Sequence, residues 1–421
     1  MGTPAAGGPV LTLQLQSALG LALLCFFAWT MGGFRRDASW RVVAGGLLGL
    51  LGLAALLLHV PFLRAGFALI GRAVDALARA TQAGTALVFG YLGGGPLPFA
   101  EVTPGSSFIL FFQALPLVLL VGALSSVLYH WRILPFVVRG LAGGLRRLFG
   151  LGGAAGLSVA ANVFVGMVEA PLLIRPWLAR LTRSELFVVM VAGLATISGN
   201  MLVVYAMIIS PIVPDAAGQL LTASLIGAPA AVLVALLMIP GGQVTEGGMD
   251  APPLYSSTME ALVQGTSDGL QLLLSVMAAL IVFVALVALG NEILQPLLGI
   301  TLQQGAGVVF WPLAWAMGVP AAEAATVAQF LGVKLVVNEF VAYLDMARGG
   351  AAGLSERSRL ILTYALCGFA NFGSVGIMLG GLCAMCPERR AEIVSLGPPS
   401  LAAATLACCM MGAAVGVLTP P

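Results

Sequence analysis

The sequence contains very little charge. Of its 421 residues only 9% are charged, whereas 60% are hydrophobic, and the mean hydropathy is +1.04. So few charges cannot cover the surface of a water-soluble domain, and this composition predicts an integral membrane protein. The net charge of +2 gives no electrostatic reason to expect a nucleic acid as partner.

Residue types that bind metals or perform catalysis are also scarce. The chain has two histidines and six cysteines, and the CxxC pair of Cys383 and Cys386 has no second pair beside it. Neither an HExxH motif nor a GxxxxGK[ST] phosphate loop occurs. We therefore expect no cofactor, no catalytic residues and no ATP-driven machinery.

Eight long apolar stretches predict helices that cross the membrane, because a spanning helix needs about 20 mostly apolar residues. They are 14–33, 42–61, 109–128, 186–210, 217–239, 265–290, 358–382 and 397–418. Two further stretches, 154–178 and 320–346, contain an acid and helix-breaking residues, so we expect re-entrant helical hairpins there. Residues 64–90 and 133–148 mix basic and apolar side chains, which favours helices along the membrane interface. The predicted fold is an all-α integral membrane protein.

Arginines predict the orientation of the chain, since basic residues collect on the cytoplasmic side of a membrane. If the N-terminus is outside and both hairpins return to the side where they start, twelve arginines are cytoplasmic. These are Arg35, Arg36, Arg41, Arg132, Arg139, Arg146, Arg147, Arg175, Arg180, Arg183, Arg389 and Arg390. Six other arginines fall outside, so the balance predicts that both termini are outside.

The two hairpin segments belong to two similar halves of the chain. Each carries a glutamate, Glu169 or Glu339, and is followed by a long apolar helix that polar residues and glycine interrupt, at 196–200 and at 367–374. Paired hairpins and broken helices in two inverted halves are typical of secondary transporters. A charge at mid-bilayer costs about 2.5–3.5 kcal/mol on insertion scales. We therefore expect both acids to face one shared polar cavity.

This repeat divides the chain into four parts. We expect residues 1–130 to form N-terminal scaffold spans with an interfacial helix. Residues 131–240 and 301–421 are the two halves of a transport domain, each with a hairpin and a broken helix, and the second half includes the last span. Residues 241–300 form a cytoplasmic loop and a scaffold span.

Six blocks between residues 105 and 415 resemble the concentrative nucleoside transporter family. They are VGMVEAP (165–171), LTASLIGAPAA (221–231), GTSDGL (265–270), KLVVNEFVAY (334–343), ALCGFANFGSVGI (365–377) and PERR (387–390). The resemblance implies a homotrimer in the bacterial inner membrane, in which each protomer has a scaffold part and a mobile transport part that contains the two hairpins and the two broken helices. It also implies sodium-coupled uptake of nucleosides.

The resemblance implies a sodium site at the first hairpin and the first broken helix. The matching positions are Asn162, Val165, Thr196 and Ile197. They supply an amide, a hydroxyl and backbone carbonyls, and oxygen ligands of this kind suit a hard cation. Proton-coupled members of the family lack the asparagine, so Asn162 favours sodium.

The resemblance also implies a nucleoside site. Glu339, Asn371 and Ser374 match the positions that hold the ribose, and Phe369 matches the aromatic residue near the base. A carboxylate and an amide suit sugar hydroxyls because both form strong, directional hydrogen bonds.

The chain departs from the family pattern where the base is recognised. Met167 and Val168 stand where the family has a glutamine followed by threonine or serine, so only Glu169 of that polar group remains, with Met201 nearby. A thioether and an isopropyl group cannot donate and accept hydrogen bonds as an amide does. We therefore expect altered base selectivity, shifted toward apolar or purine bases.

Two other classes of function remain open from the sequence. One is a passive channel or a nucleoside sensor. The other is an intramembrane hydrolase that uses Glu169 and Glu339 as an acid pair. Sodium-dependent, concentrative uptake into proteoliposomes distinguishes a symporter from both.

Overall fold

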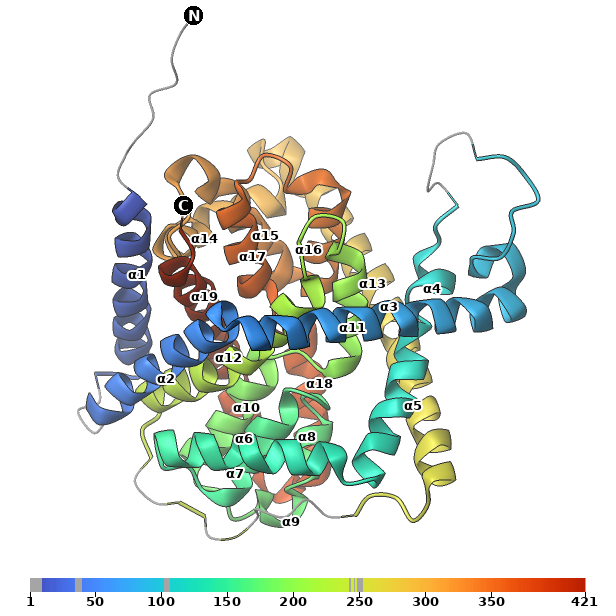
Figure 1. Cartoon of the computed structure of the whole chain (residues 1–421). Helices are drawn as coiled ribbons and strands as arrows, with labels where there is room; N and C mark the ends of the chain where they lie inside the picture. The colour runs from blue at the N-terminus through green and yellow to red at the C-terminus, as the bar shows by residue number, and fades with distance from the viewer. Residues whose placement is uncertain are drawn as a thin grey trace, which may run out of the picture.

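The protein is helical throughout the part that the structure describes. The computed structural model describes residues 10–34, 40–101, 107–241, 244–245, 247 and 253–420. These residues form helices joined by short connections and contain no strand (Figure 1). The predicted all-α class is confirmed. Arg35 and Arg36, which contributed to the predicted orientation, lie outside the described residues.

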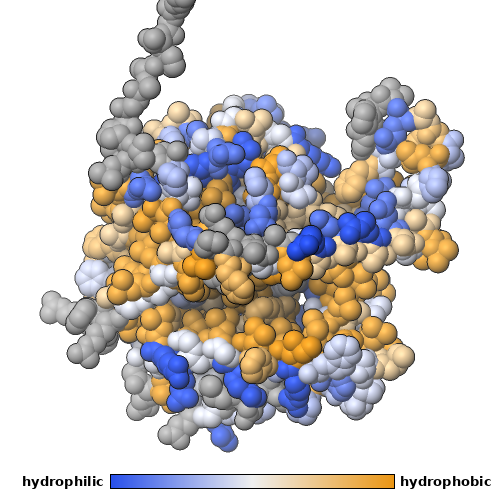
Figure 2. Space-filling view, in the orientation of Figure 1, coloured by the Kyte–Doolittle hydropathy of each residue, from blue (hydrophilic) through white to orange (hydrophobic). Residues whose placement is uncertain are grey.

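Seven segments of the described chain are long and apolar enough to cross a membrane. They comprise α1 (Val10–Met31), α2 (Trp40–His59), α4 with α5 (Leu110–Gln113 and Leu117–His130), α10 with α11 (Arg183–Ala195 and Gly199–Ile209), α12 (Ala216–Met238), α13 (Thr258–Leu298), and α19 (Arg390–Leu418) with the short 3₁₀ turn η3 (Pro387–Arg389) before it. On the face that Figure 2 shows, apolar side chains form a broad band between two more polar edges, as expected for a protein in a bilayer.

The predicted span at 358–382 is not one continuous helix. It consists of α17 (Glu356–Leu366) and the apolar α18 (Phe372–Met385), which residues 367–371 separate. At Asn371 the backbone is extended, with φ −143° and ψ 164°. The polar and glycine residues that predicted a broken helix therefore do interrupt it, and the total of eight spans stays a prediction.

Two amphipathic helices run across the direction of α1 and α5 in Figure 1. They are α3 (Pro61–Phe89) and α6 (Ile133–Phe149). In α6 the buried residues recur every three or four positions, as on one face of a helix; they are Pro135, Val138, Ala142, Leu145 and Phe149. In α3, Arg72, Asp75 and Arg79 share an exposed face. This pattern and direction are those expected of interfacial helices.

Each predicted hairpin segment folds as helices joined by a non-helical turn. The first contains α7 (Gly153–Asn162), α8 (Glu169–Leu172) and α9 (Arg175–Leu178), and the second contains α15 (Ala321–Val336), α16 (Glu339–Asp345) and the π-helical turn η2 (Met346–Gly350). In both segments the glutamate is the first residue of the helix after the turn. The remaining elements are the 3₁₀ turn η1 (Gly90–Gly93) and α14 (Leu302–Ala316), which packs along α15.

The centre of the molecule consists of α10, α11, α12 and α19, which are largely buried, whereas α13 is mostly exposed. Glycines bring α13 close to α5: a Cβ atom on Gly122 would lie 2.8 Å from the carbonyl oxygen of Gly265. Small residues of this kind allow membrane helices to pack backbone to backbone. The first turns of α1 lie beside the end of α19, where Gln14 Nε2 donates to the Thr419 carbonyl at 3.5 Å.

Candidate functional site

A cavity of about 670 Å³ lies where both hairpin segments, both broken helices and α13 meet. All eight predicted substrate-binding residues line it: Met167, Val168, Glu169, Met201, Glu339, Phe369, Asn371 and Ser374. They come from four separate parts of the sequence, which the fold brings together. Glu169 and Glu339 therefore face one shared chamber, as the sequence repeat predicts.

Four helices begin at this cavity: α8, α11, α16 and α18. Asn338 caps α16, because its Oδ1 accepts from the Val341 N–H at 2.9 Å, and Asn371 caps α18 through the Ser374 N–H at 2.7 Å. Helix N-termini carry a partial positive charge and unpaired N–H groups. The cavity is therefore polar at its helix ends although most of its lining is apolar.

Glu339 is held firmly at this site. Its side chain is only 4% exposed. The Tyr205 hydroxyl donates to Oε1 at 2.7 Å, and Asn371 Nδ2 donates to Oε2 at 2.9 Å. Because the cap of α18 uses Asn371 Oδ1, the amide nitrogen is the group that faces the carboxylate. About two acceptor positions of Glu339 remain for a ligand.

Glu169 is arranged differently, with its side chain exposed to the cavity. Gly166 lies in the non-helical turn before Glu169, and its φ of +138° is a backbone conformation that favours glycine. A Cβ atom on Gly166 would also lie 2.5 Å from Glu169 Oε2. Gly166 therefore provides both the turn and the space for the carboxylate.

Met167 and Val168 pack between helices of both halves. A Cβ atom on Gly193 of α10 would lie 3.3 Å from the Met167 Cβ, and one on Gly381 of α18 would lie 2.9 Å from Val168 Cγ1. Both residues still line the cavity. At this wall the cavity is therefore apolar, apart from Glu169.

Two of the predicted sodium ligands, Asn162 and Thr196, lie outside the cavity lining and are buried. Asn162 is 2% exposed and Thr196 is fully buried. Asn162 Nδ2 donates to the Ala192 carbonyl at 2.9 Å and contacts the Thr196 hydroxyl. Asn162 Oδ1 is buried and has no hydrogen-bond partner among the described residues. An unpaired buried acceptor costs about 1–3 kcal/mol, so this oxygen fits a cation that would bind it.

The other two predicted sodium ligands are close in the chain to this pair. Val165 lines the cavity, and the Ile197 carbonyl accepts from the Ser224 hydroxyl at 3.2 Å. The Gly199 N–H donates to the Phe164 carbonyl at 2.9 Å, which ties the first hairpin turn to the first broken helix. The donor set of amide, hydroxyl and carbonyl oxygens suits a hard cation.

Sequence analysis missed one wall of the cavity, which α13 provides. Its residues follow helical spacing: Leu272, Ser275, Val276, Ala279 and Phe283. The ring of Phe283 approaches Gly373 at the start of α18, at 3.1 Å from the position of a Cβ atom there. Tyr205 and Asn200 of α11 were also missed. The spacing along α13 could have identified a helix face, but not what that face covers.

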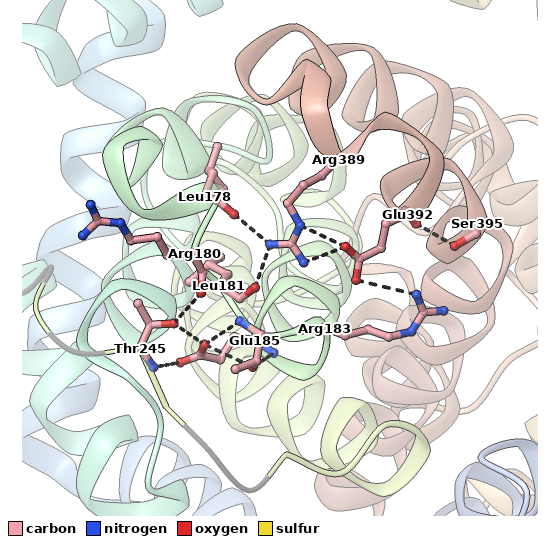
Figure 3. Close-up of polar contacts among 10 residues, drawn as sticks. Leu178, Arg180, Leu181, Arg183, Glu185, Thr245, Arg389, Glu392 and Ser395 are labelled. Carbon is pink, nitrogen blue, oxygen red and sulfur yellow. Dashed lines mark hydrogen bonds and ion pairs between the residues drawn. The ribbon is translucent and has the colours of Figure 1, made fainter.

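A second polar cluster fixes the first hairpin segment at the edge of the molecule (Figure 3). Arg389 donates to the carbonyls of Leu178 and Leu181 at 2.8 and 2.7 Å. Glu185 closes a capping box at the start of α10 and also accepts from the Thr245 N–H at 2.9 Å. These contacts join η3 to α9 and α10 to the connection after α12. None of these residues lines the cavity.

The fold and its cavity define a membrane transporter, and comparison with known proteins gives the family. Residues 19–92 and 219–416 match models of the N- and C-terminal parts of Na⁺-dependent nucleoside transporters, and residues 111–212 match a nucleoside recognition model. The chain belongs to the Na⁺-dependent, concentrative nucleoside transporter family.

Individual relatives cover nearly the whole chain. An uncharacterized transporter of Haemophilus influenzae is 39% identical over 96% of this chain and 97% of its own length. Nucleoside permease NupC of Helicobacter pylori is 31% identical, covering 96% of this chain and 97% of the permease. The structure of CNTnw in an inward-facing, substrate-bound state superposes with a TM-score of 0.89 at 35% identity, over 97% of this chain and 98% of CNTnw.

These relatives are transporters and not enzymes, which sets aside the intramembrane hydrolase. The letters GTSDG (265–269) do fit the GxSxG pattern of hydrolases. They lie inside the continuous helix α13, however, whereas a nucleophile elbow needs a strand-to-helix turn.

Proposed function

We propose that this protein is a secondary active symporter that carries nucleosides into the cell together with sodium. The observation that supports it best is the buried Oδ1 of Asn162, which has no hydrogen-bond partner among the described residues and lies three positions before Val165 of the cavity lining. A cation at Asn162, Val165, Thr196 and Ile197 would satisfy this oxygen. It would also stabilise the first hairpin turn, which forms one wall of the cavity.

In this proposal the nucleoside binds with its ribose at Glu339, Asn371 and Ser374 and with its base near Phe369 and Met201. The free acceptor positions of Glu339 and the N-terminus of α18 suit the hydroxyl groups of a sugar. A nucleoside is neutral, so the partial charges of helix ends and one buried carboxylate are sufficient for its recognition.

Base selectivity in this proposal is altered by Met167 and Val168. Both pack against glycines of neighbouring helices and present apolar atoms to the cavity beside Glu169. A wall of this kind cannot read the hydrogen-bonding edge of a pyrimidine as an amide would. It favours bases with a larger apolar surface.

The energetics of one sodium ion are sufficient for concentrative uptake. Entry of one charge across 100 mV supplies about 2.3 kcal/mol, and a tenfold sodium gradient adds about 1.4 kcal/mol. Together, roughly 3.7 kcal/mol supports accumulation on the order of 500-fold at one-to-one coupling.

We further propose that the protein is a homotrimer in the bacterial inner membrane, with both termini outside. The contact between the start of α1 and the end of α19 agrees with termini on one side. The transport domain would comprise residues 131–240 and 301–421. Residues 1–130 and 241–300 would supply the scaffold and the cytoplasmic loop.

Uptake of radiolabelled purine and pyrimidine nucleosides into proteoliposomes tests the proposal. With an inward sodium gradient we expect accumulation above the external concentration, and without sodium little uptake. A passive channel would only equilibrate the nucleoside, and a sensor would bind it without uptake. Either result would overturn the proposed symport.

A further inference from the structure

The carboxylate of Glu339 receives hydrogen bonds from both broken helices. Tyr205 belongs to α11, the second part of the first broken helix, and Asn371 lies at the break between α17 and α18. Tyr205 is fully buried, and its hydroxyl donates to Glu339 Oε1 at 2.7 Å. Tyr205 belongs to the first half of the repeat and thus binds the glutamate of the second half.

The ring of Tyr205 is fixed independently of its hydroxyl. Its centroid lies 5.1 Å from that of Tyr343 and 5.9 Å from that of Phe340. Aromatic packing at these distances restrains the ring, so the hydroxyl is presented to Glu339 in one position. Since Asn371 occupies the other oxygen, the two donors together define the rotation of the carboxylate about its own axis.

We propose that Tyr205 is a positioning residue for nucleoside binding. It acts through Glu339, by directing the two remaining acceptor positions of the carboxylate toward the cavity and thereby toward the ligand hydroxyls. This inference rests on the proposed nucleoside site, and it assigns to Tyr205 a role in affinity for the sugar and none in recognition of the base.

The test uses Tyr205→Phe, which removes one oxygen and keeps the ring. Tyr343→Phe is a matched control, because its hydroxyl also donates at 2.7 Å from a buried ring, but to the Thr363 carbonyl. Binding is measured by titration calorimetry on the purified full-length protein in saturating sodium, with adenosine, uridine and their 2′,3′-dideoxy analogues. Uptake in proteoliposomes gives KM and kcat for the same variants.

For Tyr205→Phe we expect ribonucleoside affinity to fall on the order of tenfold to 100-fold, as for a lost hydrogen bond to a charged group. KM should rise while kcat stays within about twofold, and the dideoxy analogues should lose less than about threefold. Tyr343→Phe should bind ribonucleosides like the parent protein. Unchanged ribonucleoside affinity in Tyr205→Phe, or an equal loss for the dideoxy analogues, would overturn the inference.

A second comparison covers the case in which Tyr205→Phe does not fold. The single variant Glu339→Gln is compared with a double variant that carries Glu339→Gln and Tyr205→Phe. In the double variant the side chain at position 339 is neutral, so removing the Tyr205 hydroxyl does not leave a buried charge without a hydrogen-bond donor. If Tyr205 acts only through the carboxylate, adding the tyrosine change should cost less than about threefold. A further loss on the order of tenfold or more would contradict it. If the parent binds nucleosides but shows no sodium-driven accumulation, the symport proposal fails while this test still stands.

Discussion

Glu169 and Glu339 occupy equivalent places in the two halves, yet their surroundings differ. Each begins the helix after a hairpin turn, and each lines the same cavity. Glu339 is 4% exposed and receives hydrogen bonds from two side chains, whereas Glu169 is exposed to the cavity beside two apolar residues. The two halves of the repeat therefore share a backbone arrangement at the glutamate, whereas the side chains around each glutamate differ.

The two breaks differ in the same way. At the first break Thr196 is buried behind the cavity wall together with Asn162 of the first hairpin, which suits the proposed cation. At the second break Asn371 and Ser374 line the cavity, which suits the proposed hydroxyl-rich ligand. The breaks nevertheless touch each other, since a Cβ atom on Gly368 would lie 2.7 Å from the Ala195 carbonyl oxygen. A change at one break can thus reach the other through direct backbone contact.

The largest expected effect on nucleoside affinity comes from removing the charge of Glu339, the buried glutamate. Glu339→Gln keeps the volume but weakens every hydrogen bond that a ligand makes to this group. Losing about two charge-assisted bonds should reduce nucleoside affinity on the order of 100-fold to 1,000-fold. Binding titration of the purified protein in sodium measures the change.

Glu169→Gln is the matched control, because it makes the same change at the exposed acid. We expect a loss on the order of tenfold or less there. Equal losses at both positions would mean that the structural difference between the two glutamates has no functional counterpart.

A smaller effect is expected at the proposed sodium site, where a change should alter the sodium dependence of nucleoside binding. Asn162→Ala removes the unpaired oxygen and should raise the sodium concentration for half-maximal nucleoside binding on the order of tenfold to 100-fold. Asn162→Asp keeps an oxygen in place and should retain sodium dependence. Nucleoside affinity of Asn162→Ala should recover at saturating sodium. If its sodium dependence matched that of the parent, Asn162 would not be a ligand.

The contact between the breaks can be tested through stability. Gly368→Ala places a Cβ atom against the Ala195 carbonyl and Cys408 Sγ, each 2.7 Å away. We expect a loss of about 1–3 kcal/mol in stability, as for overpacking. Gly380→Ala in α18 is the control, since nothing lies within 4 Å of its Cβ position. Thermal unfolding in detergent should lower the midpoint for Gly368→Ala alone, and equal midpoints would argue against a tight contact.

Much of this arrangement could be predicted from the sequence, for physical reasons that differ by region. Polar side chains are costly in a bilayer and glycine is a poor helix former, so Asn, Ser, Thr and Gly together at 196–200 and 367–374 marked the breaks. The face of α13 that lines the cavity gave no such signal, because most of its residues are apolar like the rest of that span. Tyr205 was missed since its role depends on Glu339, which lies 134 positions further along the chain. Glu169 and Glu339 were found through the internal repeat, and the other six cavity residues through family motifs, which encode contacts that periodicity does not.

The smallest expected effect concerns the apolar wall beside Glu169. Met167→Gln with Val168→Thr restores the amide and hydroxyl of the family pattern, and should raise uridine affinity about tenfold or less, as for one or two neutral hydrogen bonds. Adenosine affinity should change less, since a larger base gains more from apolar contact. Competition binding of the two nucleosides measures the ratio of uridine to adenosine affinity directly.

Because Val168 packs on Gly381 and Met167 on Gly193, the new side chains must keep these contacts. The single Val168→Thr variant separates the effect of packing from that of the new amide. An unchanged ratio in a folded double variant would show that this wall does not read the base, which would leave base selection to Phe369 and the α13 face.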